Sequence, residues 1–178
     1  MTNIYLLGFM GCGKSYLGKR LAEHLNWQFI DMDAYLEAKE SKTISQIFAT
    51  GGESMFRELE KNYLTATADF ENTVIATGGG CPCFYDNMEW MDVSGRTIYL
   101  KTPVPILVDR LQAETAHRPL LAGKSKQELA TFIEAKLKER GPIYEQAQTI
   151  FEYQTGREGV TELLKIVNYL EQSVEKRE

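Results

Sequence analysis

Short apolar runs alternate with amphipathic stretches along this chain. Residues 3–7 form an apolar run that Gly8 ends, and the length and composition of this run predict a buried strand. In residues 14–25 leucines recur at every fourth position, which predicts a helix with one buried face, and Asn26 can close its last turn. The chain therefore begins with a strand, a glycine-rich turn and a helix.

The same alternation continues to about residue 170. Further strands are expected at residues 27–31, 73–77, 96–101 and 149–153. Helices are expected after Asp33 to about residue 40, after Thr43 to residue 51, at 53–68, around Met88 and Met91, at 103–111, after Ser125, and at 160–170. Strands that alternate with helices, without internal repeats, predict a parallel sheet covered on both faces, which is a three-layer α/β fold.

Residues 112–124 interrupt this pattern because they show no apolar period. We expect a loop there, of a length that is more often functional than merely connective. Ser125 and Glu128 have the spacing of a capping box, so the next helix is expected to begin directly after this loop.

Length and composition add limits to this picture. The 178 residues predict a single domain over 1–178, and a hydrophobic fraction of 43% with 25% charged residues is typical of a protein with a packed core. No apolar run approaches the roughly 18 residues that a membrane span needs. The first ten residues contain no basic side chain, which argues against a signal peptide, so we expect a cytoplasmic protein with no membrane partner.

The charge and cysteine content exclude further classes. A net charge of −5 without any basic tract argues against a nucleic-acid partner. The three cysteines, Cys12, Cys81 and Cys83, are an odd number, so we expect reduced thiols rather than a disulfide framework. Two thiols without clustered histidines also make a poor zinc site, and packing is the simpler role for Cys81 and Cys83.

The turn after the first strand matches the phosphate-binding loop G-x-x-x-x-G-K-[ST] through Gly8, Gly13, Lys14 and Ser15. It lies between a predicted strand and a predicted helix, as the motif requires. Backbone N–H groups and the helix N-terminus favour bound phosphate, Lys14 adds a positive charge, and Ser15 can hold Mg²⁺. We therefore expect ATP or GTP as a ligand.

The absence of further motifs excludes several classes of nucleotide-binding protein. No Asn-Lys-x-Asp sequence follows a later strand, so a GTPase is not indicated, and the chain is too short for a large motor ATPase. The strand at 73–77 runs into glycine rather than the usual Walker-B carboxylate. The small kinases that transfer a phosphoryl group are the class that remains.

Asp31 and Asp33 follow the second strand, at the sheet edge where open α/β folds bind ligands. One carboxylate can hold the water shell of Mg²⁺, and the other can accept the proton of an attacking hydroxyl. The alternative is that Asp33 only caps the following helix. Arg57 likewise has a simpler interpretation, a solvated ion pair with Glu60, and Arg118 and Arg140 are unremarkable when taken singly.

Together these features resemble shikimate kinase across essentially the whole chain. The matching segments are Gly8 to Ser15, Asp31-Met32-Asp33, Gly52-Glu53, Phe56-Arg57 with Glu60, Gly78-Gly79-Gly80, Arg118-Pro119-Leu120-Leu121, and Arg140 with Pro142 and Tyr144. The resemblance implies a nucleoside-monophosphate-kinase-like fold with strand order 2-3-1-4-5, a mobile lid at about 112–124, and a monomer. It also implies ATP-dependent, Mg²⁺-assisted phosphorylation of the shikimate 3-hydroxyl, in the pathway to chorismate and aromatic amino acids.

The resemblance assigns roles to individual residues. Shikimate would be bound by Asp33, Arg57, Gly79, Gly80 and Arg140, with Glu60 holding Arg57 in register. ATP would be bound by Gly11, Cys12, Gly13, Lys14, Ser15, Tyr16, Arg110, Arg118 and Arg157. Lys14, Asp33 and Arg118 would be catalytic, with Arg118 swinging in on the lid to the transferring phosphate, and Mg²⁺ would be held by Ser15 and, through water, by Asp31.

Two departures from the family and two alternative functions stay open. Tyr16 stands where the family usually has Thr, so a side-chain contact to the α-phosphate can be lost while the backbone N–H is kept, and Cys-Pro-Cys after the glycines is rare. Another kinase of a hydroxylated acid such as gluconate would not need Arg57 and Arg140 together. A regulatory nucleotide-binding module that has lost catalysis would not need intact Lys14, Ser15, Asp33 and Arg118.

Overall fold

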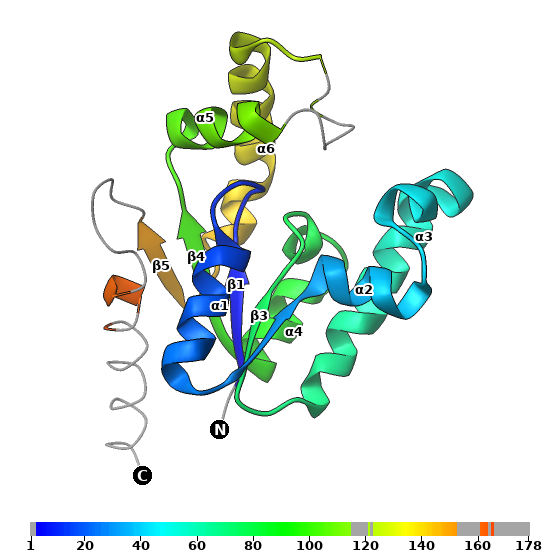
Figure 1. Cartoon of the computed structure of the whole chain (residues 1–178), viewed down its shortest axis with the longest axis vertical. Helices are drawn as coiled ribbons and strands as arrows, with labels where there is room; N and C mark the ends of the chain where they lie inside the picture. The colour runs from blue at the N-terminus through cyan, green and yellow to red at the C-terminus, as the bar shows by residue number, and fades with distance from the viewer. Residues whose placement is uncertain (1–2, 115–120, 122, 153–160, 164, 166–178) are drawn as a thin grey trace.

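The computed structural model describes residues 3–114, 121, 123–152, 161–163 and 165. At its centre lies a five-stranded parallel sheet in the order β2-β3-β1-β4-β5, which confirms the predicted order (Figure 1). The strands are β1 (Asn3–Leu7), β2 (Gln28–Asp31), β3 (Thr73–Ala76), β4 (Gly95–Lys101) and β5 (Thr149–Glu152).

The helices of the described part of the chain surround this sheet. They are α1 (Lys14–Leu25), α2 (Met32–Glu40), α3 (Ile44–Ala66), α4 (Asn87–Ser94), α5 (Val104–Glu114) and α6 (Lys126–Tyr144), with short 3₁₀ turns at Thr67–Asp69 and Cys81–Cys83. None of these described helices is long and apolar enough to cross a membrane. The amino and carboxyl ends of β1 lie at opposite edges of the sheet, and the loops at the carboxyl edge face α3 on one side and α5 and α6 on the other (Figure 1).

The two faces of the sheet carry separate cores because successive residues of a strand point to opposite sides. In β1, Ile4 and Leu6 pack with α1, α5 and α6, whereas Tyr5 and Leu7 pack with α3, α4 and the end of α6. All five residues of β1 are buried, as expected for a central parallel strand. The predicted three-layer α/β arrangement is therefore confirmed.

Local sequence determines most helix ends. Asn26 closes α1 in the left-handed conformation, and capping boxes start α3 at Thr43 and α6 at Ser125, as predicted. Gly52 (φ 68°, ψ −169°) breaks the helical path of α3, which confirms two helical segments that meet at residue 52.

The prediction places the start of the loop at 112–124 too early in the sequence. Helix α5 continues to Glu114, because Gln112, Ala113 and Glu114 extend a helix well although they carry no apolar period. Leu121, inside the expected loop, is fully buried in the core that contains α5 and α6. Strands β2 and β3 each exclude one terminal residue of the predicted ranges: Trp27 instead bonds to the end of α1, and Thr77 follows β3. Tyr153, the last residue of the predicted fifth strand, lies outside the described residues.

Candidate active site

The loop between β1 and α1 has the backbone geometry of a phosphate-binding loop. Gly8, Gly11 and Gly13 have φ values of 137°, 79° and 100°, a region that side-chain-bearing residues rarely adopt. Gly13 is the N-cap of α1 and provides no capping side chain, so the N–H groups of the first helical turn are available to an anion.

Lys14 places its ammonium group inside this loop. Its Nζ donates to the carbonyl oxygens of Gly8 at 2.7 Å and Phe9 at 3.1 Å, and lies 3.6 Å from the Cys12 sulfur. The side chain is buried, with 9% of the residue exposed. The loop therefore combines convergent N–H groups with a buried positive charge, which suits a polyphosphate.

Ser15 and Asp31 lie side by side at the mouth of the loop. The hydroxyl of Ser15 donates to Asp31 Oδ2 at 2.5 Å. The other carboxylate oxygen of Asp31 accepts from the N–H of Asp33 at 3.1 Å and of Ala34 at 3.4 Å, so Asp31 caps α2. A hydroxyl and a carboxylate next to a phosphate loop are the hard oxygen ligands that Mg²⁺ prefers, and these residues fit that ion.

The alternative role for Asp33, capping the following helix, is therefore wrong. The cap is Asp31, and Asp33 lies in the first turn of α2. A Cβ atom added to Gly78 would lie 2.9 Å from Asp33 Oδ1, so this carboxylate reaches the turn that follows β3. Asp33 thus does not serve as the helix cap, and its carboxylate lies beside the glycine turn.

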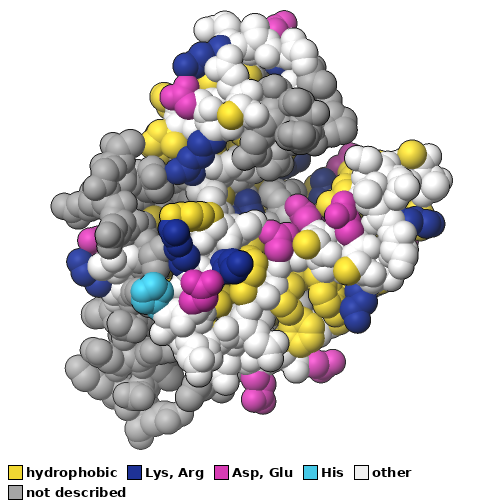
Figure 2. Space-filling view, in the orientation of Figure 1, with side chains coloured by type: hydrophobic (Ala, Val, Ile, Leu, Met, Phe, Trp, Pro, Cys, Tyr) yellow, Lys and Arg dark blue, Asp and Glu magenta, His cyan; other side chains and the backbone are white. Residues whose placement is uncertain are grey.

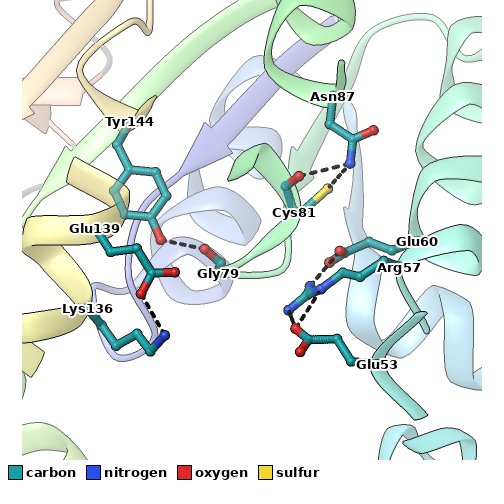
Figure 3. Close-up of polar contacts among 9 residues, drawn as sticks. All are labelled: Glu53, Arg57, Glu60, Gly79, Cys81, Asn87, Lys136, Glu139 and Tyr144. Carbon is teal, nitrogen blue, oxygen red and sulfur yellow. Dashed lines mark hydrogen bonds and ion pairs between the residues drawn. The ribbon is translucent and has the colours of Figure 1, made fainter. Parts of the chain in front are cut away.

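Arg57 is held between two glutamates of its own helix (Figure 3). Its Nη1 donates to Glu60 Oε2 at 2.7 Å, while Nη2 and Nε donate to Glu53 Oε1 at 3.1 Å and 3.3 Å. Arg57 and Glu60 are only 8% and 3% exposed, and the guanidinium also lies 4.0 Å from the ring centre of Phe84. The interpretation as a solvated ion pair is wrong, because neither partner is in bulk water.

The glycine turn at residues 78–80 packs directly against these charged side chains. A Cβ atom on Gly78 would lie 2.5 Å from Glu60 Oε1, and one on Gly80 would lie 2.7 Å from Arg57 Nη2. A Cβ atom on Gly79 would lie 3.3 Å from the backbone nitrogen of Met10, in the phosphate loop. The glycines are thus required by close approach, and they join the Arg57 site to the phosphate loop.

The buried charges shift one another's protonation. Burial raises the pKa of Glu60 to about 7, with a further contribution from Asp33, although Arg57 and Arg140 oppose this change. Burial also acts to lower the pKa of Arg57, but Glu60 and Glu53 outweigh it, so the pKa of Arg57 is raised. Arg57 therefore stays cationic, and the charges of Asp33, Arg57 and Arg140 all influence the Glu60 carboxylate.

Arg140 lies on α6, four residues before the end of this helix at Tyr144, and its charge influences the Glu60 carboxylate. The Nε atom of Arg140 is buried without a hydrogen-bond partner among the described residues. One turn later, the hydroxyl of Tyr144 donates to the carbonyl oxygen of Gly79 at 2.5 Å. Arg57 and Tyr144 therefore approach the glycine turn from opposite sides (Figure 3).

The structure describes two of the four remaining residues that were predicted to contact the nucleotide. Arg110 lies on the phosphate loop, where its Nη1 donates to the carbonyl oxygen of Gly11 at 2.9 Å. Tyr16 is 59% exposed, and its ring lies 4.0 Å from the guanidinium carbon of Arg20, one turn further along α1. Arg118 and Arg157 lie outside the described residues.

The cysteines are unpaired thiols, and within the described ranges no group of three or more His, Cys, Asp or Glu side chains could hold a metal ion. Cys81 is buried behind the glycine turn, where the Asn87 side chain donates to its carbonyl oxygen at 2.9 Å. Burial raises the pKa of both Cys81 and Cys83, which makes their thiolates less accessible. These contacts agree with a packing role.

The structure thus brings those predicted residues that it describes to one edge of the sheet, in two adjoining groups. Figure 2 shows the molecule hollowed between the region of α5 and α6 and that of α3, with basic and acidic side chains on the walls. Three contributors had no role assigned from the sequence: Glu53, Gly78 and Tyr144. The spacing of Glu53, four residues before Arg57, is the signal that could have indicated its ion pair.

Comparisons with known proteins show which family the chain resembles. The Shikimate kinase family model matches residues 10–171. The shikimate kinase of Bacteroides thetaiotaomicron is 50% identical over 151 residues, which cover 85% of this chain and 86% of that protein. The shikimate kinase of Parabacteroides distasonis is 47% identical over 152 residues, covering 85% and 88% of the two chains.

Solved structures give the same result. The crystal structure of shikimate kinase from Bacteroides thetaiotaomicron superposes with a TM-score of 0.89 at 44% identity, covering 94% of this chain and 98% of that one. Shikimate kinase from Acinetobacter baumannii in complex with shikimate gives 0.85 at 34% identity, covering 97% and 94%. A gluconokinase from Sinorhizobium meliloti gives 0.62 at 17% identity, covering 99% and 97%, which reflects the shared fold alone. The chain belongs to the shikimate kinase family.

Proposed function

We propose that the two adjoining groups of residues are the nucleotide and acceptor halves of one shikimate kinase site. As a member of this family, the protein transfers the γ-phosphoryl group of ATP to the 3-hydroxyl of shikimate, giving shikimate 3-phosphate and ADP. The reaction uses Mg²⁺ and belongs to the shikimate pathway to chorismate and aromatic amino acids.

In the nucleotide half, the backbone of residues 11–16 binds the phosphates through its N–H groups, and Lys14 moves with its flexible stem toward the oxygens that gain charge. Ser15 and Asp31 hold Mg²⁺, Ser15 directly and Asp31 through water. When bound, Mg²⁺ neutralises phosphate charge during transfer. The exposed Tyr16 side chain, stacked near Arg20, leaves only its backbone N–H for the α-phosphate.

In the acceptor half, Arg57 and Arg140 bind the shikimate carboxylate. Planar guanidinium groups match the two oxygens of a carboxylate, and the glutamates around Arg57 fix the direction of its N–H groups. The N–H groups of Gly79 and Gly80 add donors at the same place. The result is an anion-selective pocket inside a protein of net negative charge.

Asp33 carries the proton of the reaction. We propose that its carboxylate accepts a hydrogen bond from the 3-hydroxyl and takes the proton as the new P–O bond forms and the bond to ADP breaks. Its position beside Gly78, opposite the phosphate loop, supports this role. Because Asp31 caps α2, Asp33 can move without loosening the helix.

Some assignments rest on the family resemblance alone. We propose that Arg118, on a lid at about 112–124, contacts the transferring phosphate, and that the loop around Arg157 borders the adenine. Arg110 is proposed as a second contact on the nucleotide side, supported by its bond to Gly11. We further propose that residues 1–178 form one domain that acts as a cytoplasmic monomer without a nucleic-acid partner.

The single observation that supports this function most strongly is that Asp33, Arg57 and Glu60 all pack against the glycine turn at residues 78–80, directly beside the phosphate loop. A coupled ADP-release assay with ATP tests it against shikimate, gluconate and other hydroxylated acids, with and without Mg²⁺. We expect turnover only with shikimate and a divalent cation together. Turnover with gluconate, or none with shikimate, would contradict the proposed acceptor site.

A further inference from the structure

Every carbonyl group of the glycine turn at residues 78–80 has a partner on the protein side. The carbonyl of the first glycine accepts from the N–H of Cys81 at 3.1 Å, and that of the third accepts from the N–H of Cys83 at 2.9 Å. The middle carbonyl accepts from the Tyr144 hydroxyl at 2.5 Å. Tyr144 is therefore the side chain that fixes this turn.

These bonds also fix where the N–H groups point. The described peptide bonds are all trans, and in a trans peptide the C=O and the following N–H point in opposite directions. Tyr144 therefore turns the N–H of Gly80 away from itself and toward the side of Arg57 (Figure 3). The N–H groups of Gly79 and Gly80 donate to no group among the described residues.

Tyr144 is itself held firmly. Its side chain is fully buried, and its ring packs against that of Tyr99 with 5.2 Å between centroids. It lies four residues after Arg140 on α6, and these two side chains interact electrostatically. One hydroxyl thus connects the helix end that carries Arg140 with the turn that carries Gly79 and Gly80.

We propose that Tyr144 is a positioning residue for the acceptor: its hydroxyl orients the peptide between Gly79 and Gly80, so that the N–H of Gly80 faces shikimate beside Arg57, and keeps Arg140 in register with it. This inference rests on the proposed function, because it concerns the same acceptor site. It adds a residue that touches no reacting atom and acts through the backbone.

The test compares two conservative variants of buried tyrosines. Tyr144→Phe removes the hydroxyl and keeps the ring that packs on Tyr99. Tyr5→Phe is the matched control, because Tyr5 is equally buried and its hydroxyl bonds to Thr67 at 3.0 Å, away from the site. We expect Tyr144→Phe to raise the KM for shikimate about five- to tenfold, the effect of losing roughly one hydrogen bond, with little change in kcat or in the KM for ATP.

The outcomes separate the hypotheses. Tyr5→Phe should keep the KM for shikimate of the parent even where its thermal stability falls as much as that of Tyr144→Phe. An unchanged KM in Tyr144→Phe, or an equal rise for ATP, would overturn the positioning role. Since KM does not depend on the amount of folded enzyme, the comparison holds for a partly folded variant. Absence of shikimate-dependent turnover in the parent would instead overturn the proposed function itself.

Discussion

The Glu60 carboxylate accepts a hydrogen bond from Arg57 at 2.7 Å in a place where both side chains are almost fully buried. Removing one partner from such a pair leaves an uncompensated charge, which costs more than the pair contributes. The pair therefore determines the direction of the guanidinium, and Glu53, at 3.1 Å, completes the constraint. The Arg57 guanidinium therefore has little remaining conformational freedom.

That constraint predicts the effect of a charge-conserving change. Arg57→Lys should weaken shikimate binding about ten- to a hundredfold, because an ammonium group keeps the charge but cannot make the parallel bonds of a guanidinium. Arg140→Lys should have a similar effect. The Kd values from tryptophan fluorescence or calorimetry check both, with ATP affinity as the control. Equal loss for ATP and shikimate would indicate damage to the fold.

Burial of Glu60 predicts a dependence of stability on pH. Because its pKa is raised to about 7, the folded state holds a proton that the unfolded state releases near pH 4.5. The contribution of Glu60 to stability is therefore full below about pH 4.5 and falls as pH rises to about 7. Its size is on the order of 3 kcal/mol.

Denaturant unfolding of the parent and of Glu60→Gln between pH 4 and 8 measures this contribution. Their difference in unfolding free energy should decrease with rising pH and level off above about pH 7. A difference that is constant over this range would mean that Glu60 titrates normally.

Gly78→Ala should reduce kcat/KM for shikimate by about a hundredfold. The new Cβ atom would lie 2.5 Å from Glu60 and 2.9 Å from Asp33, so both carboxylates must move, and displacements of about 1 Å have effects of this size. Gly141→Ala is the matched control, because a Cβ atom there would meet nothing within 4 Å. Steady-state kinetics of the two variants test this prediction. Equal losses of kcat/KM in both would refute the steric explanation.

Lys14→Met should reduce turnover by at least about a hundredfold while the protein stays folded, because the ammonium group stabilises charge that shifts during transfer. The lost bonds to the carbonyls of Gly8 and Phe9 should also weaken ATP binding. Turnover is read from ADP release, and circular dichroism reports on the fold. Normal kcat in the folded variant would exclude the proposed role.

Arg118→Ala tests the assignment that rests on resemblance. We expect kcat to fall on the order of a thousandfold, the lower end of the range for an arginine that contacts the transferring phosphate. Single-turnover kinetics measure the chemical step directly. If kcat stays at the parent value, Arg118 is a solvated loop residue.

Local signals explain which parts of the fold were predictable. The leucine period of α1, its cap at Asn26, and the capping boxes at Thr43 and Ser125 depend on residues a few positions apart. The strand order depended on the family resemblance, because pairing between distant strands has no local signal. The end of α5 was missed for the converse reason: an apolar period shows where a helix is buried, and helices continue beyond that point.

The site residues likewise divide into those that the sequence predicts and those that it does not. The phosphate loop was predictable because each residue of its motif has a local role, whereas the burial of Arg57 depends on packing by Phe84 and by the glycine turn. The i, i+3 spacing of Arg57 and Glu60 is the same for exposed and buried pairs. Tyr144 belongs to a segment that carries the family resemblance, but its role had no local signal, since its hydroxyl bonds to a backbone group 65 positions away.

The contact between Gly79 and Met10 has a consequence for the reaction itself. A Cβ atom on Gly79 would lie only 3.3 Å from the backbone nitrogen of Met10, so the surfaces proposed to bind the acceptor and the nucleotide adjoin at one edge of the sheet. With both substrates bound as proposed, the fold itself would give their reacting atoms a high effective molarity. A side chain at residue 79 would act as a spacer between donor and acceptor, and would lengthen the path of the phosphoryl group even with every charged residue in place.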